Sequence, residues 1–196
     1  MGYVGSYNMN KVIILIIFYF GIALVTSCLN CPDVNAYYDF SSLDAEYPNG
    51  TSISVSQDFI LILSESEISY VTDNRKFNFD LLSSAWATEE CPEQGHLGKK
   101  FKIDEIIITS DSDWDEFHSA GTALNDIIQF GSTIDGSNIQ YDQFLNDVND
   151  FGEFNFGYYF KFNVPTQDTE HIFNIQVMKS NGVSVGLTTN LISWTN

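Results

Sequence analysis

The C-terminal third of this chain alternates apolar and polar residues with the two-residue period of a β-strand. In the stretch 154–164, one face carries Phe154, Phe156, Tyr158, Phe160, Phe162 and Val164. A second alternating stretch follows at 173–177, and Asn181-Gly182 leads from it into a third at 183–187. Alternation places one face of a strand in a core, and Asn-Gly favours a tight hairpin. This pattern predicts an antiparallel sheet in the C-terminal third.

Shorter apolar or alternating runs predict the remaining strands, at 36–40, 53–55, 59–63, 68–72, 101–109 and 190–194. Four isoleucines break the alternation within 101–109, which predicts a bulge or a strand buried on both faces. Helices are predicted at 122–130, which Thr122 can cap, and at 141–148, where apolar residues recur at helical spacing. We therefore expect a mainly β fold, a two-sheet antiparallel β-sandwich, immunoglobulin-like or related, with one or two short inserted helices.

The N-terminal segment has the pattern of a bacterial lipoprotein signal peptide. Lys11 precedes an apolar run, residues 12–25, of about 14 residues, which is shorter than the roughly 20 that a membrane-spanning helix needs. The run ends in Val25-Thr26-Ser27-Cys28, a lipobox in which small residues precede the cysteine that receives the lipid. We expect Cys28 to be lipidated and the protein to be anchored in the cell envelope, at the outer membrane.

The signal peptide defines the expected domain organisation. Residues 1–27 would be removed, residues 28–35 would form the lipidated N-terminus and tether, and residues 36–196 would fold as one sandwich domain. Translation can start at Met1 or at Met9. Gly2 and Ser6 also fit an N-myristoylation pattern, but a myristoylated cytosolic protein has no use for an apolar run that ends in a lipobox.

The net charge of the chain restricts the kinds of molecule that it can bind. The chain has 26 acidic and 8 basic residues and a formal charge of −18, which repels nucleic acid and anionic lipid surfaces. No nucleic-acid partner is expected, and contact with the membrane is expected only through the lipid anchor.

Once Cys28 is lipidated, Cys31 and Cys91 remain, and we expect them to form a disulfide in an oxidising compartment.

Asp111, Asp113 and Asp115 are the strongest candidates for a metal site. Their alternating spacing is the one with which an EF-hand loop begins, and carboxylate oxygens are suitable ligands for calcium. The rest of the EF-hand pattern is missing, because Glu116 stands where the turn glycine belongs and Thr122 where the bidentate glutamate belongs. The sequence leaves two alternatives, a calcium site of another kind or a solvated acidic loop.

No motif for catalysis or for a cofactor is present. His96, His118 and His171 have no zinc-binding spacing, and the chain lacks a nucleophile elbow, a P-loop and a dinucleotide fingerprint. Paired carboxylates for glycoside hydrolysis would meet only in the fold. Exposed aromatic residues could form a binding face, although aromatic residues more often fill a core. The candidates for such a face are Tyr37, Tyr38, Trp114 and Tyr159.

The lipobox, Trp86 and the runs 106–111 (IIITSD) and 120–126 (AGTALND) together resemble uncharacterised lipoproteins of Bacteroidetes that carry a domain of unknown function. The resemblance covers most of the chain after Cys28. It implies an envelope lipoprotein with a β-rich domain and no known catalytic residues. Such proteins often have a charged export tag directly after the cysteine, whereas Leu29-Asn30-Cys31-Pro32 follows it here. The face of the membrane that holds the anchor therefore stays open.

Three functions follow in order of preference. The first is a non-enzymatic module that binds an envelope protein or a glycan. The second is an envelope glycan hydrolase that uses paired carboxylates. The third is a structural or adhesive protein stabilised by calcium at Asp111, Asp113 and Asp115.

Overall fold

The computed structural model describes residues 13–14, 16–19, 34–72, 93–131, 139–150, 157–165 and 167–195. The chain divides into two compact units, one of Met1–Val34 and Asn74–Glu93, the other of Asn35–Asp73 and Gln94–Asn196. Cys28, Cys31, Cys91 and Trp86 lie outside the described residues, so lipidation, the disulfide and the predicted domain boundaries stay predictions. Within the described ranges, no helix is long and apolar enough to cross a membrane.

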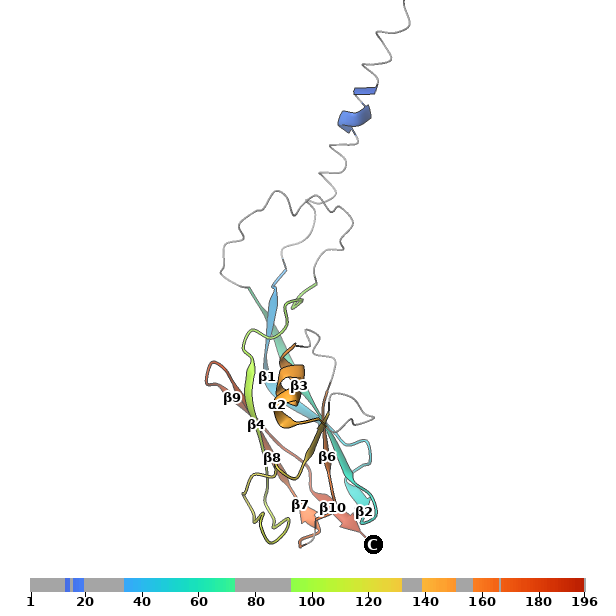
Figure 1. Ribbon diagram of the computed structural model, residues 1–196, viewed down its shortest axis with the longest axis vertical. Coiled ribbons are helices and arrows are strands. Elements are labelled where there is room, and N and C mark those ends of the chain that lie inside the picture. Colours follow the sequence, from blue (N-terminus) through green and yellow to red (C-terminus); the bar gives the residue numbers. More distant parts are fainter. Residues whose placement is uncertain are drawn as a thin grey trace, which may run out of the picture. The chain divides into compact units, whose positions relative to one another are not determined.

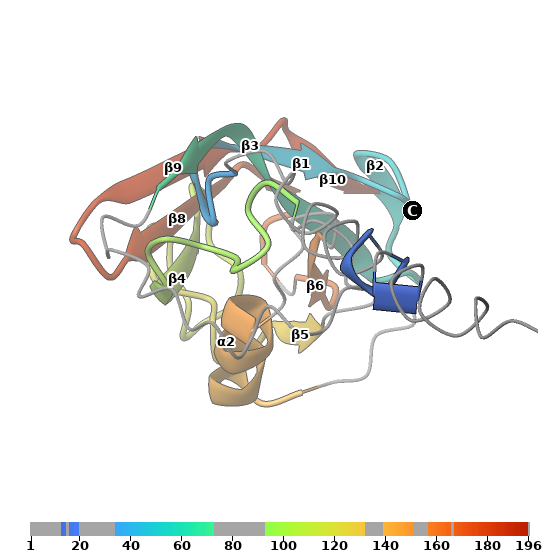
Figure 2. The same cartoon turned by 90° about the horizontal axis from the view of Figure 1, so that it is seen from above.

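The second unit is a mainly β sandwich (Figures 1 and 2). Its four-stranded sheet has the order β1-β3-β6-β5, formed by Tyr37–Glu46, Phe59–Val71, Tyr158–Phe162 and Gln129–Gly131. A three-stranded sheet has the order β4-β8-β9, formed by Ile103–Ser110, Phe173–Lys179 and Ser184–Thr188. A smaller sheet has the order β2-β10-β7, formed by Ser52–Ser54, Ile192–Thr195 and Glu170–His171. All neighbouring strands are antiparallel except β2 and β10, which confirms the predicted fold class.

The two larger sheets face each other through aromatic side chains. The ring of Phe59 on β3 lies 5.3 Å from that of Phe162 on β6 and 5.7 Å from that of Phe173 on β8, centroid to centroid. The rings of Phe162 and Phe173 are 4.6 Å apart. Each aromatic side chain buries a large apolar area, and ring pairs at these distances add a smaller attraction. The alternating residues of β6 and β8 thus form the centre of the core.

Segments 59–63 and 68–72 were predicted as separate strands, but they belong to the single strand β3. The connecting Ser-Glu-Ser-Glu contains no turn residue, and its backbone continues the ladder with β1. Glu67 has φ of 51°, a left-handed conformation that non-glycine residues rarely adopt. In the part of β1 that pairs with this point, the buried side chains are Phe40 and then Leu43. Their spacing of three residues means that β1 buries the opposite face after this point. Both strands continue through this point instead of ending.

Polar side chains close the free edge of β4. The side-chain amide of Asn149 pairs with both backbone groups of Ile103, at 2.8 Å and 2.9 Å, and the hydroxyl of Tyr141 contacts both backbone groups of Ile106. Both side chains come from helix α2, Tyr141–Asp150, which lies between β4 and β5 in Figure 2. Buried backbone groups without partners are costly. The helix therefore takes the place of a missing strand.

The predicted helix at 141–148 is confirmed as α2. A register shift between Ile103 and Glu105 agrees with a bulge, the first of the two alternatives given for 101–109. The predicted helix at 122–130 is wrong. Residues 124–128 make one turn, and the chain then enters β5. The reason is that the amide of Leu124 donates to the carbonyl of Ile108, and the side chain of Asn125 bonds to β4. These long-range contacts outweigh the local preference for helix.

Gly157, just before β6, allows β3 and β6 to approach. A Cβ added there would lie 2.2 Å from Cγ2 of Ile62. We expect Gly157→Ala to lower the free energy of unfolding by about 1–3 kcal/mol because Ile62 must shift. Urea denaturation measures the change. Gly186→Ala is the control, because its nearest atom is an ordinary 3.7 Å away. Adding Ile62→Ala should make Gly157→Ala nearly neutral, and an equal cost in both backgrounds would contradict the clash.

Candidate functional site

The loop after β4, residues 111–120, is held by its own carboxylates, and we refer to it as the acidic loop. Asp111 accepts a hydrogen bond from the backbone N–H of Ile172 at 2.7 Å. Asp113 accepts one from Ala120 at 2.7 Å, and the amide of Asp113 in turn donates to Asp168 at 3.0 Å. These carboxylates bind backbone donors that the irregular chain would otherwise leave without partners.

Asp115 holds the tip of the acidic loop. One of its carboxylate oxygens accepts from the backbone N–H groups of Phe117 and His118 and from Nδ1 of His118, each at 2.8 Å. The other ring nitrogen of His118 contacts Asp126 at 3.1 Å. The hydrogen bond with Asp115 is the main cause that raises the pKa of His118 above its usual value, and Asp126 raises it further. Burial alone would raise the pKa of Asp115, but its bonds with His118 and Phe117 give a net lowering.

The predicted metal ligands therefore have another use in the fold. Within the described residues, no group of three His, Cys, Asp or Glu side chains is placed to hold a metal ion. Asp111, Asp113 and Asp115 each receive backbone N–H donors instead. Calcium binding at these three residues stays a prediction, whereas their bracing of the loop is a property of the structure.

A serine and a histidine meet beneath the acidic loop. The hydroxyl of Ser110 lies 2.7 Å from Nδ1 of His171, and Nε2 of His171 donates to the backbone carbonyl of Asp168 at 2.9 Å. A nucleophile and its base need such a contact. Here, however, His171 is fully buried and Ser110 is 3% exposed, beneath the rings of Trp114 and Trp194. The pair is a core contact because no substrate can reach the hydroxyl.

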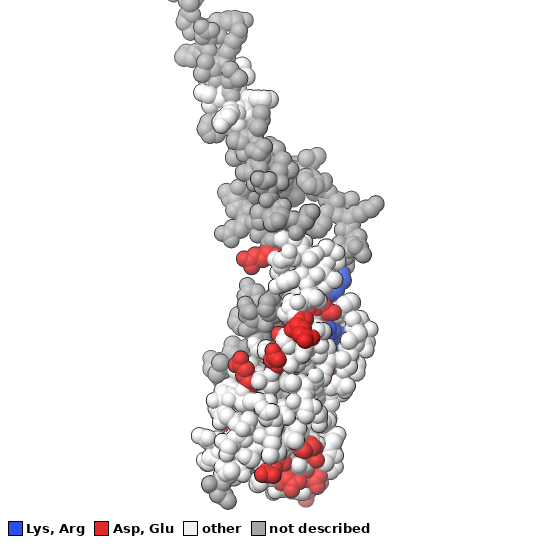
Figure 3. Space-filling model, turned by 180° about the vertical axis from the view of Figure 1, so that it is seen from behind, with Lys and Arg blue, Asp and Glu red and all other residues white. Residues whose placement is uncertain are grey.

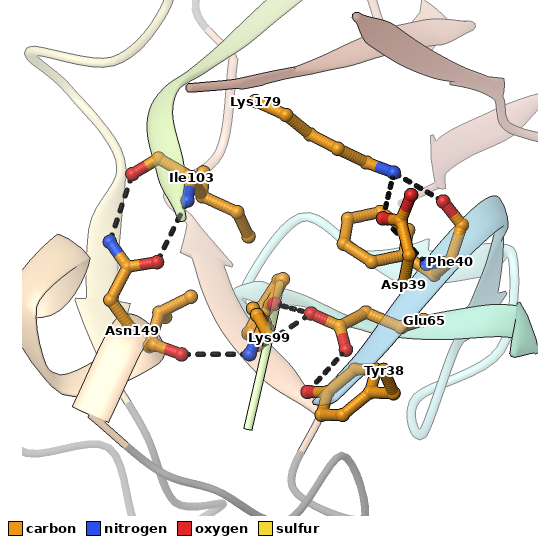
Figure 4. Close-up of polar contacts among 10 residues, drawn as sticks. Tyr38, Asp39, Phe40, Glu65, Lys99, Ile103, Asn149 and Lys179 are labelled. Carbon is orange, nitrogen blue, oxygen red and sulfur yellow. Dashed lines mark hydrogen bonds and ion pairs between the residues drawn. The ribbon is translucent and has the colours of Figure 1, made fainter. Parts of the chain in front are cut away.

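A buried carboxylate, Glu65, lies in the middle of β3 (Figure 4). It accepts hydrogen bonds from the hydroxyls of Tyr38, at 2.9 Å, and of Tyr158. Lys99 forms an ion pair with it at 3.1 Å and donates to the carbonyl of Val148 at 2.9 Å. Burial first, and then the charge of Glu65, raises the pKa of both tyrosines, so both stay protonated donors. This Glu65 cluster is satisfied internally and has a structural role.

Lys179 is a second buried cation. Its side chain is 2% exposed, and its ammonium group lies 2.6 Å from the carboxylate of Asp39 and over the ring of Phe40, 4.1 Å from the centroid (Figure 4). It also donates to the backbone carbonyl of Phe40. The last residue of β8 is thereby attached to the free edge of β1. Neither Lys99 nor Lys179 is placed to meet a ligand.

The aromatic candidates divide between core and surface. Tyr38, Trp114 and Tyr159 are buried, which confirms the core position that the sequence favoured over an exposed binding face for these residues. Tyr37 is partly exposed and lies under Lys100, 4.9 Å from the ring centroid. The sequence analysis missed Phe117, which is 79% exposed at the tip of the acidic loop. Its position among acidic residues was the only available signal.

The comparisons with known proteins identify no relative. No protein-family model, no curated protein and no solved structure matches the chain. The function must therefore be argued from the residues and contacts described above.

Removing Lys99 tests the Glu65 cluster. We expect Lys99→Met to lower the free energy of unfolding by about 3–5 kcal/mol, because it leaves a buried carboxylate without its cation. Chemical denaturation measures the loss. Lys102→Met, at an exposed position, is the control and should change stability by less than about 0.5 kcal/mol. Adding Glu65→Gln to Lys99→Met should restore part of the loss. Equal effects of the two lysine variants would exclude a stabilising ion pair.

The acidic loop should respond to pH through His118. Because folding raises the pKa of His118, its protonated form stabilises the fold fully below the usual pKa of 6.5, and this contribution disappears as pH rises through the raised value. The stability difference between wild type and His118→Gln should thus be larger at about pH 5.5 than at about pH 9. Urea denaturation at the two pH values measures it. Asp126→Asn should reduce the pH dependence, and a pH-independent difference would refute the pairing.

Proposed function

We propose that the chain is a lipid-anchored lipoprotein of the cell envelope, related to the Bacteroidetes lipoproteins that its sequence resembles, and that its sandwich is a non-enzymatic binding module. The lipobox at residues 25–28 supports the anchor. The sandwich supports the binding role, because the Ser110–His171 pair and the Glu65 cluster are both enclosed in the core. No described contact favours a glycan hydrolase or a calcium-dependent adhesin over this function.

The exposed ring of Phe117 is the observation that carries the proposal. It is the most exposed of the large apolar side chains that the structure describes. Aromatic side chains, phenylalanine included, are enriched at protein interfaces relative to the rest of the surface. The N–H of Phe117 is held by Asp115, and the amide of Trp114 donates to the carbonyl of His118, so the loop needs little ordering on binding.

Charge indicates the kind of partner. Asp111, Glu116 and Asp126 are exposed near Phe117 in the sequence, and carboxylates gather at the loop end of the sandwich in Figure 3. A complementary protein surface would carry basic residues around an apolar pocket for the ring. We therefore propose an envelope protein as the partner of the acidic loop.

The anchor is tested by Cys28→Ala. We expect metabolic labelling with a radioactive fatty acid to mark the wild-type protein and to be abolished by this substitution, because Cys28 supplies the thiol that is lipidated. Cys31→Ala is the matched control and should keep the label. Equal labelling of wild type and Cys28→Ala would refute lipidation at this residue.

The binding surface is tested by crosslinking the full-length lipoprotein in intact cells, followed by mass spectrometry. One envelope protein should crosslink to wild type, and Phe117→Ser should reduce its yield at least about tenfold, because the ring supplies the anchor. Leu191→Ser, which removes a half-exposed apolar side chain elsewhere, is the control. Equal crosslinking by all three proteins would exclude the loop as the contact.

A further inference from the structure

The outer face of the β4-β8-β9 sheet contains a hollow of about 320 Å³. Three neighbouring strands supply its lining, in two rows across the sheet: Ile107, Gln176 and Gly186 form one row, and Thr109, Asn174 and Thr188 form the next. The space exists because Gly186 has no side chain, whereas Ile107 and Gln176 in the same row each have one. The hollow lies on the face of the sheet opposite to the aromatic core.

Neither the backbone nor the packing explains the glycine at position 186. Its φ is not in the left-handed region, and β9 keeps a regular register with β8 on both sides of it, so no bulge or turn requires it. A Cβ would fit, because the nearest atom is the carbonyl oxygen of Ile175 at 3.7 Å. Glycine weakens a strand interior, and a regular strand keeps one mainly where another molecule approaches the backbone closely.

The lining is uncharged and contains both polar and apolar groups. The hydroxyl of Thr188 donates to the side-chain carbonyl of Asn174 at 2.8 Å, which leaves the amide N–H groups of Asn174 able to donate. Within the described part of the chain, the amide of Gln176 and the hydroxyl of Thr109 form no side-chain hydrogen bond. The hollow therefore offers donors and acceptors together, beside the apolar side chain of Ile107.

We propose that this hollow binds an uncharged saccharide. Sugar hydroxyls both donate and accept, which matches amides and hydroxyls, and the C–H groups of a sugar ring can contact Ile107. A charged ligand would find no counter-ion in the lining, and the charge of −18 disfavours anions further. This inference goes beyond the protein contact at Phe117 and is independent of it.

Binding of neutral oligosaccharides to the full-length protein tests the proposal. The probes are tetrasaccharides of glucose, mannose, xylose and N-acetylglucosamine, measured by calorimetry in a detergent without a sugar headgroup, with tetragalacturonate as the anionic comparison. At least one neutral probe should bind, and Gly186→Leu and Gln176→Ala should each weaken it at least about tenfold. Gly186→Leu fills the hollow, and Gln176→Ala is the second variant if the leucine disturbs folding.

Two controls locate the binding. Ser184→Leu adds the same side chain on the same face of β9, outside the lining, and should change affinity less than about twofold. Phe117→Ser should also leave saccharide affinity unchanged, which separates this proposal from the protein contact. The proposal is overturned if no neutral probe binds at millimolar concentration, if tetragalacturonate alone binds, or if Gly186→Leu and Gln176→Ala both bind like wild type.

Discussion

Every strand at the edge of a sheet has backbone donors and acceptors that need partners, and the way this chain supplies them determines much of its architecture. Asn149 and Tyr141 bond to the free edge of β4, and Lys179 bonds to that of β1. Helix α2 is positioned by this requirement as much as by its buried Phe144 and Val148. Edges satisfied in this way are also unavailable to other chains, which limits aggregation through strand pairing.

The same requirement explains the positions of several charged groups inside or beside the core. Glu65, Lys99 and Lys179 are paired within the fold, and the carboxylates of the acidic loop bind backbone N–H groups. The hollow over Gly186 is uncharged and the ring of Phe117 is apolar, whereas Asp111, Glu116 and Asp126 stay exposed near Phe117 in the sequence.

Local patterns in the sequence predict the strands and helices whose formation depends on residues close together in the chain. The alternation at 158–162 and 173–177 and the spacing of Phe144 and Val148 identify β6, β8 and α2 correctly. The helix predicted at 122–130 fails because Asn125 bonds to a strand 17 residues away. Tyr159 is buried although alternation places it on the polar face, where it lies beside Ile62 and Gly131 of the neighbouring strands. Ser110 and His171 are 61 residues apart and give no local signal.

The ion pair between Lys179 and Asp39 has a consequence for how the protein is made. It joins residues 140 positions apart, so the strands that carry them can meet only after nearly the whole chain has been synthesised. Contacts of such sequence separation slow folding, because long loops must close before any contact compensates the lost entropy. Because β8 supplies the partner of Asp39 on β1, the sandwich cannot close fully while the chain is still being synthesised.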